Sequence, residues 1–494
     1  MIIEYAKREV VFFSENDIKQ IKSHGLNLDV VNRQIEKFET GFPFVDIVKP
    51  VSVADGVRKI SDEDARKYMT IYEIYQLSHT IVKFVPASGA ATRMFKELFD
   101  FLMSNRPNKI SMETTMNISR FAFWDELRPY LPRNATDMNI ADCLVTSSGL
   151  NYGNMPKALI LFHKYPDCTK TSIEEHLEEG IQYARSANGV NLHFTISPEH
   201  RSDFEDLLQK VIPEYESKYG IKYNVSLSEQ KSSTDTIAMN LDNTVFRNND
   251  NTLLFRPAGH GALIENLNDI DADLIFIKNI DNVSVDFLRD DTIKYKKVLA
   301  GVLIDVQNQI FDLIRAIDSG TANIDTVHDF VVNNTGIRLD RKLSLPEYRD
   351  ILNRPIRICG VVRNTGAHGG GPFWVRTPDG RISLQIVESG QIGPASKYVM
   401  EKSEYFNPVD LVCGVKNSAG GKFDLTQYVD EDMGFISEKS KNGLPLRAME
   451  RPGLWNGAMA KWNTIFVDVP MSTFTPVKVV TDLLLPEHQG IKVI

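Results

Sequence analysis

"DLIFIKNIDN" (residues 273–282) is a nearly continuous apolar run that ends in an acid. A strand in an α/β protein has this pattern when helices cover both faces of its sheet. In open sheets of this kind, ligands bind beyond the carboxyl ends of the strands. The stretch therefore predicts a buried central strand, and it places Asp281 at the edge of the sheet where a ligand binds.

The segments before this strand alternate between strand and helix periods. Residues 190–196 alternate apolar and polar side chains, residues 204–212 carry a helical apolar stripe, and residues 221–227 alternate again. Further along, residues 368–388 contain a Gly-rich turn and a Pro-Asp-Gly turn that predict a hairpin. These patterns predict an α/β fold with additional β-rich elements towards the C-terminus.

The pattern of apolar residues divides the chain into three parts. Residues 1–80 are expected to form a helical segment, with capping signals at Ser14 and Ser61. Residues 81–345 are expected to form the α/β core, with a helical insertion at about 100–150, and residues 346–494 an α+β part.

Composition excludes several classes of protein. The net charge is −9, so no general basic surface is available to bind a nucleic-acid backbone. The N-terminal stretch turns polar too soon for a secretion signal, and no apolar run is long enough to span a bilayer. We therefore expect a cytoplasmic protein with no nucleic-acid or membrane partner.

The four cysteines form no CxxC pair, which argues against a zinc ribbon or a disulfide framework.

A small-residue turn follows a second apolar strand in "VKFVPASGAATRMFKEL" (82–98). Small residues let backbone N–H groups face outward, and the start of a helix adds positive potential, so this turn is suited to cradle a phosphate. Arg93 would supply a planar donor to phosphoryl oxygens. Asp281 is suited to hold magnesium, which prefers carboxylate and phosphate oxygens.

Together with three further stretches, these segments resemble the sugar nucleotidyltransferase superfamily, in particular the UDP-sugar and UDP-N-acetylhexosamine pyrophosphorylases. The matching motifs are, in order, Ser88-Gly89-Ala90-Ala91-Thr92-Arg93, Pro156-Lys157, Gln230, Pro257-Ala258-Gly259-His260-Gly261 and Asp281-Asn282. The chain as a whole is similar to a bacterial domain family of unknown function in this superfamily. The resemblance implies a GT-A-like, Rossmann-type mixed sheet flanked by helices.

The resemblance also implies an activity: Mg²⁺-dependent formation of a nucleotide sugar and pyrophosphate from a nucleoside triphosphate, UTP favoured, and a sugar 1-phosphate. Arg93, Lys157 and Asp281 would be catalytic. The implied triphosphate and base contacts are Ser88, Gly89, Ala90, Ala91, Thr92, Gln230, Gly259, His260 and Gly261, with the two glycines giving the uracil ring room. The implied sugar contacts are Asn279, Asn282, Glu388, Asn456 and Gly457. Asp281 and Asn463 would bind Mg²⁺.

The sequence departs from the family pattern in the phosphate loop, where Ser88 and Ala91 replace glycines. A methyl group at position 91 would push a triphosphate away, or would be tolerated if the residue keeps a negative φ. Two alternatives therefore stay open. One is a nucleotide-sugar-binding protein without turnover, and the other is a GT-A glycosyltransferase, which has no need of the Thr-Arg and Pro-Lys pairs.

Overall fold

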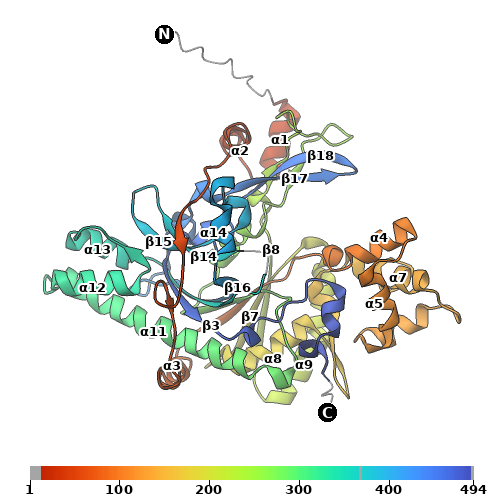
Figure 1. The fold of residues 1–494 in the computed structure, drawn as a ribbon, viewed down its shortest axis with the longest axis horizontal. Helices are drawn as coiled ribbons and strands as arrows, with labels where there is room; N and C mark the ends of the chain where they lie inside the picture. The colour runs from red at the N-terminus through yellow and green to blue at the C-terminus, as the bar shows by residue number, and fades with distance from the viewer. Residues whose placement is uncertain (1–12, 367–369, 491–494) are drawn as a thin grey trace, which may run out of the picture.

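A nine-stranded sheet forms the centre of the protein in the computed structural model, which describes residues 13–366 and 370–490 (Figure 1). The strand order is β2-β19-β13-β16-β11-β3-β7-β6, and β8 also pairs with β7. The bounds are β2 (Val57–Arg58), β19 (Asn463–Asp468), β13 (Ile356–Arg363), β16 (Tyr405–Gly414), β11 (Leu274–Lys278), β3 (Ile81–Pro86), β7 (Gly189–Ile196), β6 (Arg185–Ser186) and β8 (Tyr223–Glu229).

Strand direction gives this sheet two different edges. β16 and β6 run antiparallel to their neighbours, and the remaining strands all run parallel to β11. We call the edge where these parallel strands end the carboxyl edge and the opposite one the amino edge. Asp281 follows β11 and so belongs to the carboxyl edge.

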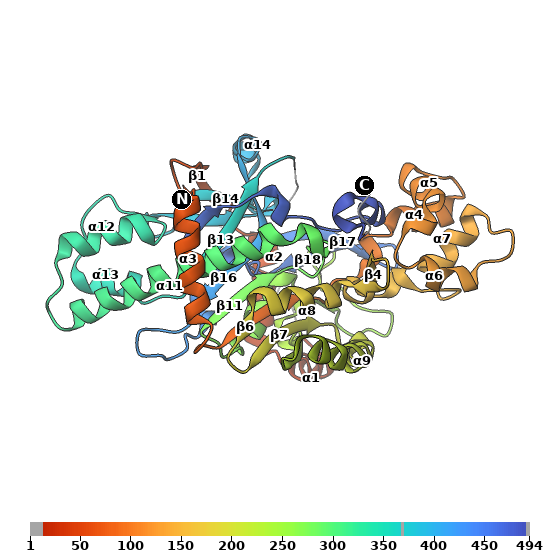
Figure 2. The same ribbon diagram turned by 90° about the horizontal axis from the view of Figure 1, so that it is seen from below.

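One face of the sheet is covered by helices α11 (Asp290–Asp318) and α3 (Asp62–Tyr75), and α3 crosses α11 and packs against it (Figure 2). Their apolar residues pack with those of β11 and β13 in one buried cluster. Phe276 points into this cluster, whereas Ile275 and Ile277 point into a cluster on the other face. β11 is therefore buried on both faces, which explains why its sequence does not alternate.

The other face is covered in part by a four-stranded sheet of order β1-β14-β15-β12. Its strands are β1 (Asp46–Pro50), β14 (Gly371–Arg376), β15 (Ile382–Val387) and β12 (Ile337–Arg338). The short pairs β4–β5, β9–β10 and β17–β18 comprise Leu161–Lys164 and Thr169–Thr171, Thr236–Ile237 and Phe255–Arg256, and Phe435–Lys441 and Leu444–Glu450.

Helices lie at both ends of the long axis of the molecule (Figures 1 and 2). α4, α5, α6 and α7 form the predicted helical insertion at one end, and α12 and α13 lie at the other. The remaining helical bounds are α1 (Glu15–Ser23), α2 (Leu28–Thr40), α4 (Lys96–Ser104), α5 (Lys109–Met116), α6 (Trp124–Leu127), α7 (Asp137–Val145), α8 (Ser172–Tyr183), α9 (Arg201–Tyr219), α10 (Ile264–Asn268), α12 (Ile324–Asn334), α13 (Leu345–Leu352) and α14 (Lys397–Glu401).

The predicted fold class is confirmed: the core is a mixed α/β sheet flanked by helices. The expectation of a helical segment over residues 1–80 is wrong in one part. Its residues 1–12 lie outside the described residues, and residues 46–58 include β1 and β2, which pair with β14 and β19.

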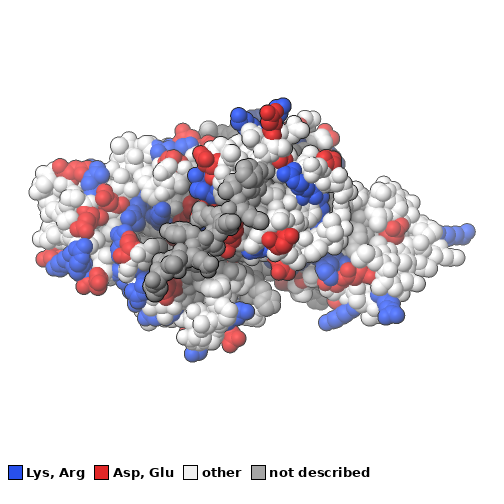
Figure 3. Space-filling view, turned by 90° about the horizontal axis from the view of Figure 1, so that it is seen from above, with Lys and Arg blue, Asp and Glu red and all other residues white. Residues whose placement is uncertain are grey.

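The four cysteines are free, and only Cys168 is exposed. On the face shown in Figure 3, acidic and basic side chains are interspersed over the described surface.

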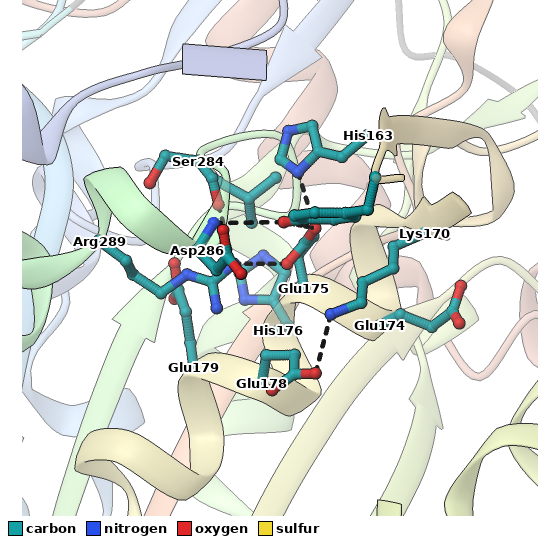
Figure 4. Close-up of polar contacts among 12 residues, drawn as sticks. His163, Lys170, Glu174, Glu175, His176, Glu178, Glu179, Ser284, Asp286 and Arg289 are labelled. Carbon is teal, nitrogen blue, oxygen red and sulfur yellow. Dashed lines mark hydrogen bonds and ion pairs between the residues drawn. The ribbon is translucent and has the colours of Figure 1, made fainter. Parts of the chain in front are cut away.

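Helix α8 carries acidic residues into the interior of the protein. Glu175 and Glu179 are fully buried and Glu178 nearly so (Figure 4). The two carboxylate oxygens of Glu179 accept hydrogen bonds from two buried lysines, Lys83 on β3 at 2.9 Å and Lys278 on β11 at 2.7 Å. Burial of an ionised group is costly unless it is paired, so α8 is fixed in the one position where these pairs form.

We expect Glu179→Gln to lower the free energy of unfolding by about 3–5 kcal/mol, because it leaves buried lysines without their carboxylate. Urea denaturation would measure the change. Glu404→Gln is the matched control, since Glu404 pairs with Arg363 at the surface, where an ion pair contributes less than about 1 kcal/mol. Equal effects of the two substitutions would contradict the prediction.

Lys83 predicts a dependence of stability on pH. Lys83 and Lys278 share Glu179 while buried Lys296 pairs with Asp410, so this group holds three lysines and two carboxylates. Burial lowers the pKa of Lys83 from 10.5 to about 7. Between these values the unfolded chain keeps a proton that the folded protein has lost, so this residue makes stability rise with pH above 7, by at most about 1.4 kcal/mol per pH unit.

We therefore expect Lys83→Met to flatten that rise. Urea denaturation of both proteins between pH 6 and pH 9 would measure it, and a rise that is as steep in Lys83→Met as in the unsubstituted protein would refute the assignment.

Candidate active site

Two lysines from distant segments meet the carboxylate of Asp281 at the carboxyl edge. The Nζ atoms of Lys157 and Lys478 donate to the Oδ2 atom of Asp281 at 2.9 and 3.1 Å. The side chains of Lys157 and Asp281 are only 12% and 10% exposed, whereas that of Lys478 is 58% exposed. The structure therefore brings together two predicted catalytic residues, Lys157 and Asp281, and the exposed Lys478 adds a third charge to them.

The Asp281 carboxylate is ionised at neutral pH. Burial alone would raise its pKa, but the ammonium groups of Lys157 and Lys478 outweigh burial and hold the pKa below its ordinary value. The cluster has two positive charges and one negative charge, which leaves an excess of one positive charge at this point of the carboxyl edge. Such an arrangement favours an anion next to the two lysines.

The turn after β3 lies against the segment that carries Lys157. The N–H of Ala91 donates to the carbonyl of Met155 at 2.9 Å, and the N–H of Lys157 donates to the carbonyl of Gly89 at 3.2 Å. Gly89 and Ala90 are exposed, and the position of a Cβ on Gly89 would be open. The predicted phosphate turn and Lys157 are thus neighbours, as their order in the resemblance implies.

Ala91 does not act as the sequence suggested. Its N–H is used by Met155, so it is not available to a phosphate. Its side chain is fully buried in the cluster of the helical insertion, and its φ is not positive. The methyl group therefore points into the core and does not obstruct a ligand. Thr92 and Arg93 are exposed, and no hydrogen bond or ion pair to Arg93 is found within the described residues.

Residues 473–489, which we call the C-terminal strap, connect these parts. Asn282 accepts a hydrogen bond from the N–H of Thr475 and donates to the carbonyl of Thr473. The N–H of Val477 donates to the carbonyl of Asp281 at 3.0 Å. The strap then reaches the turn after β3, where the N–H of Val480 donates to the carbonyl of Met94. It places Lys478 over Asp281 and ties β11 to that turn.

The far end of the strap is fixed by a chain of buried side chains. Nδ1 of His488 lies 2.9 Å from Nε2 of His163, and Nδ1 of His163 lies 2.8 Å from the Glu175 carboxylate. Figure 4 shows His163 and Arg289 on either side of Glu175. Burial would raise the pKa of Glu175, but His163 and Arg289 hold it at about 2. An ionised carboxylate thus anchors the strap through two imidazoles.

Helix α8 also supports the residues that precede Asp281. His176 lies with its Nε2 atom 3.2 Å from the carbonyl oxygen of Ile280, and Glu179 holds Lys278. Both contacts come from the buried side of the helix. The loop that carries Asp281 is therefore supported from below by α8 and covered from above by the strap.

Gly259 and Gly261 accommodate the protein itself. A Cβ at Gly259, where φ is +76°, would lie 2.2 Å from Oε2 of Glu450, and a Cβ at Gly261 would lie 2.2 Å from the carbonyl oxygen of Pro452. The expectation that these glycines give room to a uracil ring is wrong in this respect. The groups that approach them belong to residues 450–452.

His260 belongs to a second cluster that includes a predicted sugar contact. Its Nδ1 atom accepts a hydrogen bond from the N–H of Leu454, so Nε2 carries the ring proton and donates to Glu388 at 3.0 Å. The ring stacks on that of Trp455 with centroids 4.0 Å apart. The structure thus brings two predicted residues, His260 and Glu388, into direct contact.

Several other expectations need correction. Asn463 begins β19 at the amino edge, buried, with its Nδ2 donating to Ile351, so it cannot share a cation with Asp281 beyond the opposite edge. The side-chain amide of Asn282 binds the strap with both its oxygen, which accepts from Thr475, and its nitrogen, which donates to Thr473. Asn456 bonds to Gln391 and to the N–H of Gly457, and Gly457 is buried against Met433 and Pro452. These three predicted sugar contacts, Asn282, Asn456 and Gly457, therefore have structural partners within the chain.

Two predicted residues occupy positions that a ligand can reach. Gln230 directly follows β8 at its carboxyl end and is partly exposed, with Nε2 3.3 Å from Asp235. Asn279 is also partly exposed and follows β11, where its carbonyl accepts from the N–H of Asn282. Both belong to the carboxyl edge, and their predicted roles stay predictions.

Sequence reasoning missed Lys478. Its signal was present, since "TPVKVV" (475–480) places a lysine after a proline in a short apolar run, as "MPKALIL" (155–161) does for Lys157. Nothing in the sequence shows that these two lysines, one 124 residues before Asp281 and the other 197 residues after it, meet the same acid.

The carboxylate donors do not form a cation cage. No group of three His, Cys, Asp or Glu side chains is placed to hold a metal ion within the described ranges. Asp281 already has two lysine partners on one oxygen, and Asn463 lies at the other edge. Magnesium often keeps only one or two protein carboxylates and takes its other ligands from water and substrate phosphates, so Asp281 fits a cation that arrives with a phosphate ligand, not a resident one.

A protein-family model described as "Domain of unknown function (DUF4301)" matches residues 14–489. The chain belongs to the DUF4301 family. The predicted similarity to a domain family of unknown function is confirmed by this match. A comparison with curated proteins found no match. Within the described part of this DUF4301 protein, no helix has both the length and the apolar character needed to cross a membrane.

Solved structures similar to this DUF4301 protein include three pyrophosphorylase-type enzymes. The uridine diphosphate N-acetylglucosamine pyrophosphorylase from Trypanosoma brucei has 12% identity and a TM-score of 0.48, covering 95% of this chain and 79% of that chain. A UDP-glucose phosphorylase from Trypanosoma brucei has 14% identity and a TM-score of 0.46, with 95% and 77% covered. A UDP-glucose pyrophosphorylase mutant from Leishmania major has 13% identity and a TM-score of 0.45, with 95% and 77% covered.

The imidazole chain predicts that His488→Ala loosens the strap. Loss of its contact with His163 should make amide hydrogen exchange at Val477 and Val480 at least several-fold faster, because the strap then opens at a lower free-energy cost. Hydrogen exchange with mass spectrometry of peptides spanning 470–485 would measure this. His200→Ala, at a partly exposed surface position, is the control. Unchanged exchange in His488→Ala would show that the imidazoles do not anchor the strap.

Proposed function

We propose that this protein is a sugar-1-phosphate nucleotidyltransferase that joins a nucleoside triphosphate, UTP favoured, to a sugar 1-phosphate and releases pyrophosphate. The observation that carries the proposal is the meeting of Lys157 and Lys478 on the ionised Asp281 at the carboxyl edge. A transfer between two anions needs cations and alignment more than it needs a nucleophilic side chain. This cluster supplies the cations.

In this proposal, an oxygen of the sugar 1-phosphate attacks the α-phosphorus of the triphosphate. The bond between that phosphorus and the oxygen bridging to the β-phosphate breaks, and pyrophosphate leaves with the electron pair. Lys157 and Lys478 reduce the repulsion between the two phosphates, and Arg93, exposed on the neighbouring turn, neutralises charge on the departing pyrophosphate. No covalent intermediate on the protein is needed.

Magnesium enters the proposal as part of the substrate. The triphosphate arrives as its magnesium complex, and Asp281 contributes one carboxylate oxygen when phosphate oxygens draw the lysines towards themselves. The side chain of Lys478 is the most exposed of the three, so it is the group best able to move. Lys157 and Lys478 then pair with phosphate oxygens of the substrate in place of the Asp281 carboxylate, so neither lysine is left without an anion.

Gln230 is proposed for base recognition, and Asn279 and Glu388 for the sugar. Gln230 offers an amide that can both donate and accept, which suits a pyrimidine edge. Asn279 precedes Asp281 by two residues, so a sugar phosphate next to Asp281 places its sugar within reach of this side chain.

A second function, binding of a nucleotide sugar without turnover, is favoured by one observation. The Ala91 N–H in the phosphate turn is already hydrogen bonded to Met155. That turn therefore offers one donor fewer than the sequence suggested, which weakens the hold on a triphosphate more than the hold on a diphosphate. Turnover separates the two functions.

We expect pyrophosphate release when the protein is incubated with Mg²⁺, UTP and a panel of sugar 1-phosphates. Lys157→Met, Lys478→Met and Asp281→Ala should each lower kcat/KM by roughly a hundredfold or more, because each removes a charge that acts in the transition state. A coupled pyrophosphate assay would measure the rates.

Lys231→Met is the control, since Lys231 pairs with Asp269 at the surface and should keep the full rate. Calorimetric titration with UTP and with UDP-glucose completes the test. Binding of UDP-glucose without pyrophosphate release from any pair would favour the binding protein, and release that persists in Asp281→Ala would remove the cluster from the mechanism.

A further inference from the structure

A cavity of about 740 Å³ opens at the amino edge of the sheet, away from Asp281. Arg354 lies just before β13 and Trp462 just before β19, and both line it. The end of the β14–β15 hairpin, Gln385 on β15, Phe44 and Tyr428 also line it. The volume is in the range of small-molecule sites, roughly 300–1,000 Å³. The proposed function uses none of these residues.

The acids that line this cavity are largely neutralised by their own partners. Asp46 pairs with Arg376 at 3.4 Å, Asp379 pairs with Arg381, and Asp432 pairs with Lys37 at 2.6 Å. The remaining acid, Asp430, accepts the N–H of Asp432 as a turn cap. These groups are therefore committed to each other and to the backbone.

Arg354 has no such partner. Its Nε atom donates to the carbonyl of Asp350 at 3.1 Å, and its two terminal nitrogens make no hydrogen bond or ion pair within the described chain. Burial lowers the pKa of this guanidinium, yet arginine keeps its proton in proteins. Asp379 and Asp350 act on this guanidinium electrostatically, but neither forms an ion pair with it. A partly buried cation that makes no ion pair favours an anion in the cavity. Lys461, also without an ion-pair partner in the described residues, adds a second cation at the exposed rim.

Two buried polar atoms of lining residues also lack partners. They are Oε1 of Gln385 and Nε1 of Trp462, and both side chains are almost fully buried. The amide nitrogen of Gln385 is fixed by hydrogen bonds to Ala460 and Ser383 at 2.7 and 2.9 Å, which sets the direction of Oε1. Buried polar atoms are nearly always satisfied, so this acceptor and this donor add polar groups without internal partners to residues that line the cavity.

We propose that this cavity is a second binding site for a small organic anion with a flat, apolar body. Its carboxylate, phosphate or sulfonate group pairs with the forked guanidinium of Arg354. Its body lies between Phe44, which is 62% exposed without it, and Tyr428. Because the cavity belongs to the amino edge and the lysine cluster to the carboxyl edge, such a ligand does not compete with a nucleotide.

The probe is anilinonaphthalene sulfonate, a flat apolar anion whose fluorescence rises when it is bound, titrated into the full-length protein. Phenylnaphthylamine, which has the same rings without the charge, is the matched probe. We expect saturable binding of the anion, and Arg354→Met should weaken it roughly tenfold to a hundredfold, the effect of losing a charged hydrogen bond. Saturating UTP should leave it unchanged.

Arg349→Met is the control, because Arg349 on α13 pairs with Asp318 at the surface. Arg354→Lys keeps the charge but loses the fork, so it should bind with intermediate affinity, and it serves if Arg354→Met does not fold by circular dichroism. Equal affinity in Arg354→Met and the unsubstituted protein, equal binding of the uncharged probe, or displacement by UTP would each overturn the proposal. Failure of the pyrophosphate assay leaves this result unaffected.

Discussion

Asp281 and its two lysines hold together three parts of the chain that are distant from one another in the sequence. Lys157 comes from the segment before β4, Asp281 from the end of β11 and Lys478 from the strap. The same region is reinforced by hydrogen bonds to the backbone of the strap, which the carbonyl of Asp281 and the side-chain amide of Asn282 make. Charge pairing and backbone pairing thus fix the same segments, so the position of each lysine follows from the position of one acid.

The interior beneath this cluster is unusually polar for a sheet-helix layer. Glu175 and Glu179 on α8 face cations from β3, from β11 and from Arg289 before α11. Apolar side chains tolerate small sliding motions, whereas a buried ion pair forms only when both partners are in register. The acids of α8 therefore locate the helix, and His176 then supports the loop before Asp281. The buried ion pairs of α8 therefore both stabilise the fold and order the residues that precede Asp281.

Much of the framework could be predicted from the sequence, because strand periodicity is a local property. The strands at 189–196, 223–229 and 274–278 and the hairpin of β14 and β15 all follow from patterns within a few residues. The turn after β3, Lys157 and Asp281 could also be placed at one edge, since parallel strands end together.

The predictions that were wrong concerned residues whose contacts are made by segments distant in the sequence. Gly259 and Gly261 signal a close approach, but the sequence does not say that residues 450–452 make it. Asn463 begins its strand, whereas Asp281 follows its own, and a motif alone does not tell which edge it occupies. The buried acids of α8 look like a solvated helix face until Lys83 and Lys278 are brought beside them by the sheet.

The C-terminal strap sets the order in which the site can be completed during synthesis. Asp281 leaves the ribosome 197 residues before Lys478, so Lys157 is the only one of its two lysine partners present until the strap is made. A nascent chain can pair Lys157 with Asp281 once β11 has been made, but Lys478 is added only after β19 (Asn463–Asp468). The second lysine therefore joins the site only after every strand of the central sheet has been synthesised.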